Sequence, residues 1–309
     1  MNAAGRRALV TGATGYVGTH VVRRLLAEGW TVGIVARPSS PTAAFGPADA
    51  PVPVHRDDGD DGALSAFARN FRPGVLVHLA ALYIAAPEER DRPALEAANI
   101  HFARRVGAAT AGTGAHGIVA AASHLQMRGD SDDPVPAPHG LYAGTKQAGE
   151  DALAGIAAAR GMTFTSLVLF DTYGPGDPRR KLFDQLAEAA VANTTLAMSP
   201  GGQCLDLVWI EDAAAAFVAA AARAASGEAR GRERFAVGSE ERPPLRDIVD
   251  RWRRAGGPTP AIDWGALPYR PHQPMMPWRG PRLPGWQPRV ALDEGLARMA
   301  TALRHRDGG

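Results

Sequence analysis

Residues 8–18 of the chain read ALVTGATGYVG, and this stretch decides the fold. It predicts a short apolar strand, a glycine-spaced turn and the first turn of a helix. Gly12 lets the chain turn off the strand, Gly15 lets the backbone approach a pyrophosphate, and Gly18 lets the helix pack closely on the strand. Free N–H groups and the helix dipole then attract the phosphates. The cofactor-binding residues predicted here are Gly12, Thr14, Gly15, Tyr16 and Val17.

The segments around the turn supply the context that this pattern requires. An amphipathic helix follows it, and a second strand is predicted over 31–35. Strands and helices go on alternating, which predicts an α/β fold of the Rossmann type, a doubly wound parallel sheet with its ligand crevice at the carboxyl ends of the strands. The alternative for the turn is an ordinary strand-to-helix connection without a ligand.

The second half of the chain predicts a smaller substrate-binding lobe. Proline is frequent over 258–288, together with three tryptophans, so this stretch is not regular helix and is interpreted as an ordered lobe or lid. A final helix is expected over 292–303. The domains predicted are a dinucleotide-binding domain over 1–174, with 203–238 returning to it, and a C-terminal lobe from 175–202 and 239–309.

Composition narrows the classes of function. Of 309 residues, 45% are hydrophobic, and 34 Lys and Arg against 32 Asp and Glu give a net charge of +2. Acidic residues are interspersed among the arginines of 223–254, which favours a solvated helical face over nucleic-acid binding. Cys204 is the single cysteine, so we expect a reducing, cytoplasmic setting. We expect no membrane span, no signal peptide and no metal site.

The end of the second predicted strand bears on the choice of cofactor. Folds that bind NAD usually place an acidic residue there to hold the ribose 2′-hydroxyl. This chain has Ala36 at that position, followed by Arg37, Ser39 and Ser40. A guanidinium and two hydroxyls suit a 2′-phosphate, so the sequence predicts NADP(H). The alternative is a surface arginine at a strand end.

Two further strand ends are expected to contact the cofactor. Asp57 and Asp58 follow the third predicted strand, 52–55, and one of them is expected to accept a hydrogen bond from the adenine amino group; the alternative is a solvated acidic loop. The buried strand predicted over 75–81 ends in small residues, against which the cofactor can lie. The residues predicted to contact it there are Leu79, Ala80 and Ala81.

A second constellation carries acid–base chemistry. Tyr142 and Lys146 are four residues apart and therefore share one face of a predicted helix. A free phenol has a pKa near 10, and we expect the ammonium and an oxidised nicotinamide to lower that value. Ser123 ends the strand predicted over 117–123 and is placed to bind the substrate oxygen beside the tyrosine. The alternative, a chance YxxxK, is weakened by the glycine turn and the serine upstream.

A cationic stretch follows the strand predicted over 163–170. Residues 171–177 are expected to be irregular, and a helix is expected over 182–192. Arg179, Arg180 and Lys181 lie at the start of that helix, where cations oppose its dipole. We therefore expect an anion, such as a substrate phosphate, nearby. The alternative is a solvated loop.

These motifs together resemble the extended short-chain dehydrogenase/reductase family, the NAD-dependent epimerase/dehydratase group. The resemblance rests on TGATGYVG at 11–18, HLAA at 78–81, and Asn99, whose matching position in the family contacts the cofactor. Ser123, Tyr142 and Lys146 match the family's catalytic set. The motifs LFDTYGPGDPRRKLF at 169–183 and GGQCLDLVWIED at 201–212 are similar to its substrate-side motifs. The substrate-binding residues that the resemblance implies are His124, Asp171, Arg179, Arg180, Lys181 and Arg279.

Departures from the family pattern narrow the expected activity. Its 4,6-dehydratases carry an acidic pair after the catalytic hydroxyl, where this chain has His124 and Leu125. Its epimerases usually hold NAD with the acid that Ala36 replaces, and a phosphate-binding arginine is replaced by Leu205. RPSS at 37–40 and GPGDPRRK at 174–181 resemble most the NADPH-dependent 4-ketoreductases of nucleotide-diphosphate sugars, such as the CDP-abequose synthase type, and the family resemblance implies a homodimer. A nucleotide-sugar epimerase, a non-catalytic NADP-binding sensor and a reductase of a non-sugar ketone stay open.

Overall fold

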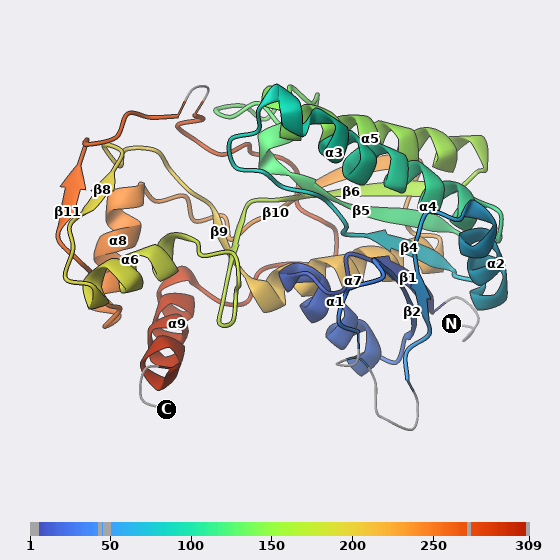
Figure 1. Cartoon of the computed structure of the whole chain (residues 1–309), viewed down its shortest axis with the longest axis horizontal. Helices are drawn as coiled ribbons and strands as arrows, with labels where there is room; N and C mark the ends of the chain where they lie inside the picture. Colours follow the sequence, from blue (N-terminus) through green and yellow to red (C-terminus); the bar gives the residue numbers. More distant parts are fainter. Residues whose placement is uncertain (1–5, 43–44, 46–50, 271–272, 307–309) are drawn as a thin grey trace.

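A seven-stranded parallel sheet lies at the centre of the computed structural model, which describes residues 6–42, 45, 51–270 and 273–306. The strands follow the order β10-β6-β5-β4-β1-β2-β3 (Figure 1). This is the doubly wound α/β fold that the sequence predicts. Its strands are β1 Arg7–Thr11, β2 Thr31–Ala36, β3 Val54–Arg56, β4 Val75–His78, β5 Gly117–Ser123, β6 Thr163–Leu169 and β10 Arg232–Val237.

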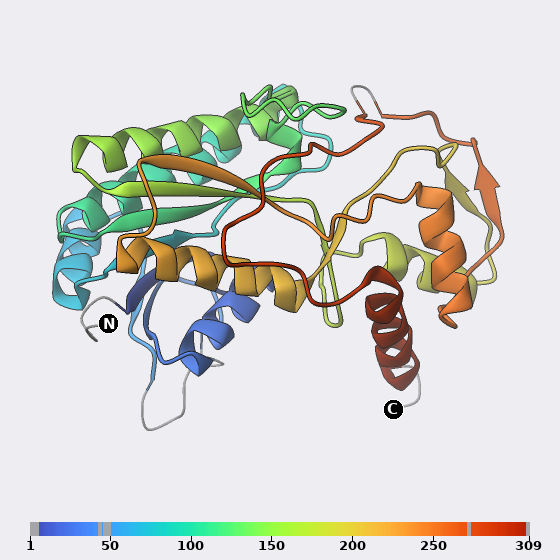
Figure 2. The same ribbon diagram turned by 180° about the vertical axis from the view of Figure 1, so that it is seen from behind.

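Helices cover both faces of this sheet. On one face α1 packs against α7, and on the other α4 packs against α2 and α5 (Figures 1 and 2). Both layers bury Val, Leu, Ile and Ala side chains against the strands, so each face has its own apolar core. The helices are α1 Tyr16–Ala27, α2 Asp61–Phe71, α3 Arg92–Glu96, α4 Phe102–Ala111, α5 Gly140–Ala159 and α7 Ile210–Ser226.

A smaller lobe lies beyond the carboxyl ends of the strands (Figure 1). Its aromatic core brings Tyr173, Phe183, Trp209 and Trp252 together. Two small parallel sheets, β8 with β11 and β7 with β9, join its segments. The elements are β7 Asp171–Tyr173, α6 Leu182–Val191, β8 Leu196–Met198, β9 Leu207–Trp209, α8 Leu245–Arg254, β11 Ile262–Trp264 and α9 Leu292–Arg306.

The structure corrects one expectation in this region. Residues 171–177 were expected to be irregular, but their first three form β7, which pairs in register with β9 from Asp171 opposite Leu207 to Tyr173 opposite Trp209. The partner strand lies far along the chain, so no local pattern indicates the pairing. The pair carries the backbone from the sheet into the lobe.

Residues 278–290, here called the return segment, cross back from the lobe to the sheet (Figure 2). The indole N–H of Trp286 donates to the Asp212 carbonyl oxygen at 3.0 Å, and the Asp212 carboxylate accepts from the Arg289 and Val290 amides. Trp286 is buried in the core cluster that contains α1 and α7. The polypeptide therefore crosses between the lobe and the sheet more than once. The domain boundaries given above stay predictions.

Within the described part of the chain, no helix is both long and apolar enough to cross a membrane.

Candidate active site

The glycine turn has the backbone geometry that its sequence requires. Gly12 has φ +69°, and a Cβ at this position would lie 2.6 Å from the Ala80 amide nitrogen, so only glycine fits. A Cβ on Gly18 would overlap the Gly12 carbonyl oxygen, which confirms close packing of α1 on the turn. Gly15 is exposed and a Cβ there would meet only one atom at 3.4 Å. The turn is therefore open on the side where a pyrophosphate is expected.

A buried polar pair joins the ends of β1 and β4 beside this turn. The hydroxyl oxygen of Thr11 accepts from the Ala80 amide at 3.3 Å and lies 2.9 Å from Nδ1 of His78. Burial lowers the pKa of His78 to about 3, and Lys146 adds to this, so the imidazole is neutral. The pair fixes the stretch that contains Leu79, Ala80 and Ala81. Sequence reasoning singled out this stretch but gave no role to the Thr11 hydroxyl, which accepts from the Ala80 amide.

The end of β2 presents no carboxylate. Ala36 ends the strand, Arg37 and Ser39 are exposed, and Ser40 is buried. The guanidinium of Arg56, at the end of β3, donates to the carbonyl oxygens of Arg37 at 3.3 Å and of Ser40, and so holds this loop. Arg37 makes no side-chain hydrogen bond or ion pair within the described residues. The region therefore carries unneutralised positive charge, and sequence reasoning missed Arg56.

Asp57 and Asp58 lie at the end of β3, as expected. Both Asp57 carboxylate oxygens accept from the Arg105 guanidinium, at 2.8 and 3.0 Å, and that guanidinium also contacts Asp61. The Asp58 carboxylate accepts from the Asp60 amide at 3.2 Å. Because a carboxylate oxygen has two lone pairs, these bonds leave capacity for an adenine amino group. The predicted adenine contact stays a prediction.

The structure brings Ser123 and Tyr142 together. Ser123 ends β5, Tyr142 and Lys146 lie on α5, and the serine hydroxyl is near enough to the phenol to lower its pKa. Burial raises the pKa of Tyr142 to about 12, with Tyr83 adding to it and Ser123 opposing it. The sequence-based expectation that Lys146 lowers this pKa is not met in the protein alone, because burial dominates the shift and Lys146 is not among the groups that contribute to it. Burial also lowers the pKa of Lys146 to about 8, against the opposing charge of Glu150.

Tyr83 lies edge-on to the Tyr142 ring, with the ring centroids 4.9 Å apart, and it is 53% exposed. Its neighbour Leu82 is held on both sides by buried Asn99, which accepts from the Leu82 amide at 2.8 Å and donates to its carbonyl at 3.1 Å. Asn99 also donates to Thr145 on α5. Asn99 therefore sets the loop above the phenol, and no motif in the sequence indicates Tyr83.

The substrate-side residues divide into two groups. His124, Asp171 and Lys181 lie together, with the Lys181 ammonium 3.0 Å from the Asp171 carboxylate. Against the effect of burial, Lys181 and His124 hold the pKa of Asp171 below its usual value. Burial lowers the pKa of His124, whose ring stacks on Phe170. His124, Phe170 and Asp171 line a small pocket whose other walls include Cys204, Leu205, Asp206 and Pro274.

The remaining cations lie apart from this pocket. Arg179 bonds to the Asp177 carboxylate and stacks over the Tyr16 ring, 5.0 Å from its centroid. Arg180 pairs with Glu188 at the surface. The three cations at the α6 terminus therefore have internal partners, which removes the reason to require an external anion there. Arg279 is exposed, and its backbone amide donates to the Ser131 carbonyl.

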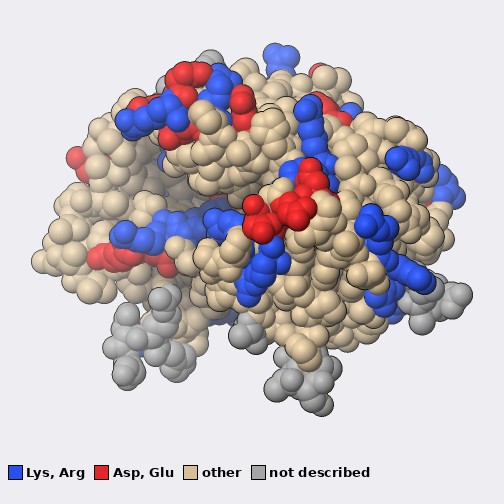
Figure 3. Space-filling view, turned by 45° about the vertical axis from the view of Figure 1, so that its right-hand side comes forward, with Lys and Arg blue, Asp and Glu red and all other residues tan. Residues whose placement is uncertain are grey.

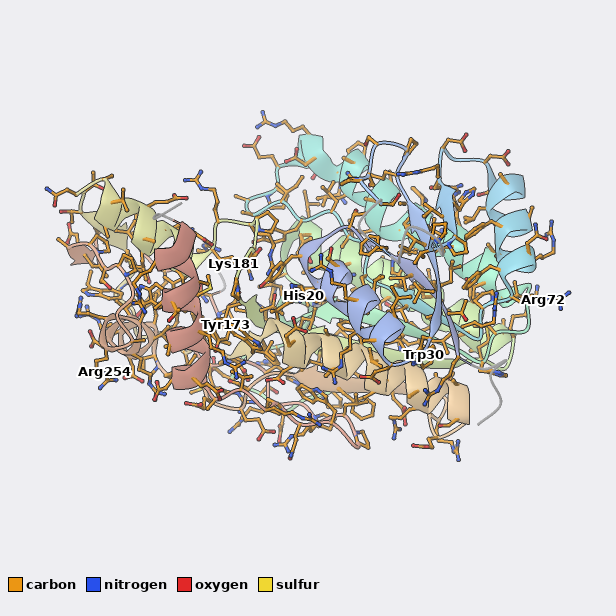
Figure 4. The ribbon with its side chains drawn as sticks, turned by 90° about the horizontal axis from the view of Figure 1, so that it is seen from below. His20, Trp30, Arg72, Tyr173, Lys181 and Arg254 are labelled. Atoms are coloured by element: carbon orange, nitrogen blue, oxygen red, sulfur yellow. The ribbon has the colours of Figure 1, made fainter. Side chains whose placement is uncertain are left out.

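The pocket lies where the sheet meets the lobe. Lys181 and Tyr173 lie at this junction, with His20 of α1 on the sheet side and Arg254 far out in the lobe (Figure 4). The surface is hollowed on this side, and basic side chains lie along the rim (Figure 3). Ligands of open α/β sheets bind outside the carboxyl ends of the strands. The glycine turn, Ser123 and Tyr142 all lie at that edge.

Comparison with known proteins identifies relatives with this architecture. The model of the NAD dependent epimerase/dehydratase family matches residues 8–238. A UDP-glucose 4-epimerase of Mycolicibacterium smegmatis is 29% identical over 97% of this chain and 99% of its own. A CDP-abequose synthase of Yersinia pseudotuberculosis is 45% identical over 49 residues, 16% of this chain and 17% of its own. The solved UDP-glucose 4-epimerase of Thermus thermophilus, in complex with NAD, matches with a TM-score of 0.77 at 24% identity, over 96% and 99% of the two chains.

Proposed function

Because the chain belongs to the NAD dependent epimerase/dehydratase family, we propose that it reduces the 4-keto group of a nucleotide-activated 4-keto-6-deoxyhexose with NADPH. When bound, NADPH would supply the hydride that the carbonyl carbon accepts. Tyr142 donates its phenolic proton to the carbonyl oxygen, Ser123 orients that oxygen, and Lys146 binds the ribose and stabilises the phenolate that remains. The observation that supports the proposal is that Ser123 and Tyr142 lie close enough for the serine hydroxyl to lower the pKa of the phenol, at the edge of the sheet that holds the glycine turn.

Charge at the end of β2 supports NADP(H) over NAD. A 2′-phosphate is repelled by a carboxylate at this position and attracted by a guanidinium. Ala36 leaves the position without charge, and the exposed Arg37 side chain makes no hydrogen bond or ion pair within the described residues. Arg56 adds a second guanidinium behind the same loop. The proposed cofactor is therefore NADP(H).

Nucleotide-sugar epimerisation is the second candidate, and its support is specific. A relative that matches 97% of the chain is named as a UDP-glucose 4-epimerase. Epimerisation needs the same Ser–Tyr–Lys set, but the cofactor is regenerated in each turnover. A non-catalytic NADP-binding sensor and a reductase of a non-sugar ketone remain weaker candidates, since the complete catalytic set argues against the first. A cytoplasmic homodimer is part of the proposal.

The decisive experiment follows NADPH oxidation by its absorbance with a panel of TDP-, CDP- and GDP-linked 4-keto-6-deoxysugars. The proposal expects one NADPH consumed for each product formed. Inversion at C4 of a UDP-linked hexose, without net loss of cofactor, would establish the epimerase instead. In Tyr142→Phe, turnover should fall by about 10²- to 10⁴-fold while NADPH binding is retained, because only the proton donor is removed. Turnover near the wild-type value would refute the role of Tyr142.

A further inference from the structure

A buried glutamine lies directly behind the Ser123 turn and takes no part in the mechanism above. Gln126 ends a short 3₁₀ turn, His124–Gln126, and none of its surface is exposed. Its side-chain oxygen accepts from the Ser123 amide at 2.8 Å. Its amino group donates to the Gln147 side-chain oxygen at 2.9 Å and to the Glu150 carboxylate at 3.0 Å. The amide is therefore fully engaged, as a buried polar group must be.

These partners allow only one orientation of the Gln126 amide. The Ser123 amide is a donor, so the oxygen must face it, and the Glu150 carboxylate is an acceptor, so the amino group must face it. The Gln147 amide is oriented in turn by donating to the Asp151 carboxylate at 3.0 Å. The donors and acceptors are therefore consistent along the whole network, which is a condition for a polar cluster that rigidifies its surroundings.

The far end of the network is clamped. Glu150 is buried on α5, eight residues after Tyr142 and four after Lys146, so the three share one helix face. Its second carboxylate oxygen pairs with Arg234 on β10, and Arg232 lies 3.7 Å from it. Gln126 thus ties the turn after β5 to an anchored side chain on the helix that carries the phenol and the ammonium.

We propose that Gln126 is a positioning residue, which holds the Ser123 turn at a fixed distance from Tyr142 and Lys146. The inference rests on the proposed function, since its consequence is measured in the reduction step. Ser123 reaches the phenol from the end of a strand, and its hydroxyl also accepts from the Leu125 amide at 3.3 Å. Without Gln126, the serine keeps this local contact and the pairing of its strand with β6, where it lies opposite Leu169, but the turn after it loses its tie to α5.

The test compares Gln126→Met with Gln147→Met in the full-length protein. Methionine fills nearly the same volume as glutamine but makes no amide hydrogen bond, so both variants keep the packing. Gln147→Met also removes a buried amide from this network, but it leaves the bonds from Gln126 to Ser123 and Glu150 intact. Two readouts apply: kcat and KM for NADPH and sugar, and hydrogen exchange of the Ser123 amide in the free protein.

In Gln126→Met, we expect kcat to fall by about 10- to 100-fold, because a displacement of about 1 Å at a reacting group has effects of that size. The KM for NADPH should stay within about twofold. The Ser123 amide should exchange at least about tenfold faster, whereas Gln147→Met should leave both readouts near wild type. Equal kcat in the two variants, or unchanged exchange at Ser123, would overturn the inference. If the wild type reduces none of the sugars, the proposed function fails, and the exchange result still decides whether Gln126 holds Ser123.

Discussion

The glycine turn and the entrance to α6 differ in how they are held. In the glycine turn, the constraints are backbone contacts at close range: Gly12 against Ala80, and Gly18 against Gly12. At the α6 entrance, the constraints are ion pairs between side chains, such as Lys181 with Asp171 ten residues away. A backbone constraint fixes the type of residue, whereas an ion pair can be formed by many arrangements of the same charges. The first kind of site can be predicted from a sequence, and the second cannot.

Gly12→Ala and Gly176→Ala compare a glycine that backbone contacts constrain with one that has open space around it, and we expect the largest difference in stability here. Both glycines have positive φ, +69° and +75°, but a Cβ on Gly12 meets the Ala80 backbone while a Cβ on Gly176 meets nothing within 4 Å. We expect a loss of about 4–5 kcal/mol and no NADPH binding for Gly12→Ala. Gly176→Ala should lose about 1 kcal/mol, the cost of a left-handed alanine. Urea unfolding and cofactor titration measure both, and equal losses would contradict the contrast.

His78, which is buried and neutral, makes the free energy of unfolding depend on pH. The pKa of His78 is about 3 in the folded protein, below the value near 6.5 of an unfolded histidine. As the pH falls below about 6.5, His78 takes up a proton in the unfolded chain but stays neutral in the folded protein, so the free energy of unfolding falls. This histidine should remove about 3 kcal/mol between about pH 6.5 and pH 4. Urea unfolding across this range should show a shallower fall for His78→Asn and an unaltered one for the exposed His116→Asn.

Substitutions of Arg179 and Arg180, on the lobe side, should have the smallest effects on stability. Arg179→Gln leaves the buried Asp177 carboxylate with only a backbone partner and should cost about 1–2 kcal/mol, reduced because the arginine is partly exposed. Arg180→Gln removes an exposed pair with Glu188 and should leave the melting temperature unchanged. Neither should raise the KM for the sugar nucleotide if internal pairing is the role of these cations. A large rise in that KM would restore the phosphate-binding interpretation.

Most of the sheet could be predicted because its strands are continuous apolar runs. The predicted strand 117–123 coincides with β5, and the others agree within a few residues. The pairing of β7 with β9 could not be predicted, since each contributes three residues and the pairing joins distant segments. The position of the return segment could not be predicted for a similar reason. Its proline-rich composition excludes a helix but does not indicate that the segment packs on α7.

The candidate site was predicted unevenly for the same reason. Spacing along a helix places Tyr142 and Lys146 on one face, and a strand end exposes Ser123. Their pKa values and positions depend on residues from other parts of the chain that pack around them. Burial raises the pKa of Tyr142, with Tyr83 adding to it, and Gln126 anchors the serine turn. Neither Tyr83 nor Gln126 belongs to a recognisable motif, so both effects appear only in the structure.

The return segment has a consequence for biogenesis. β10 ends the sheet, and its outer side is engaged where the Ala236 amide donates to the Pro281 carbonyl at 2.8 Å, beside a bridge to Arg282. A nascent chain therefore completes β10 well before its cover has been synthesised, and until then it presents an unpaired strand edge to other chains. Protein that ends before residue 281 should for this reason associate through the exposed edge of β10. Synthesis of the C-terminal segment therefore prevents this form of aggregation.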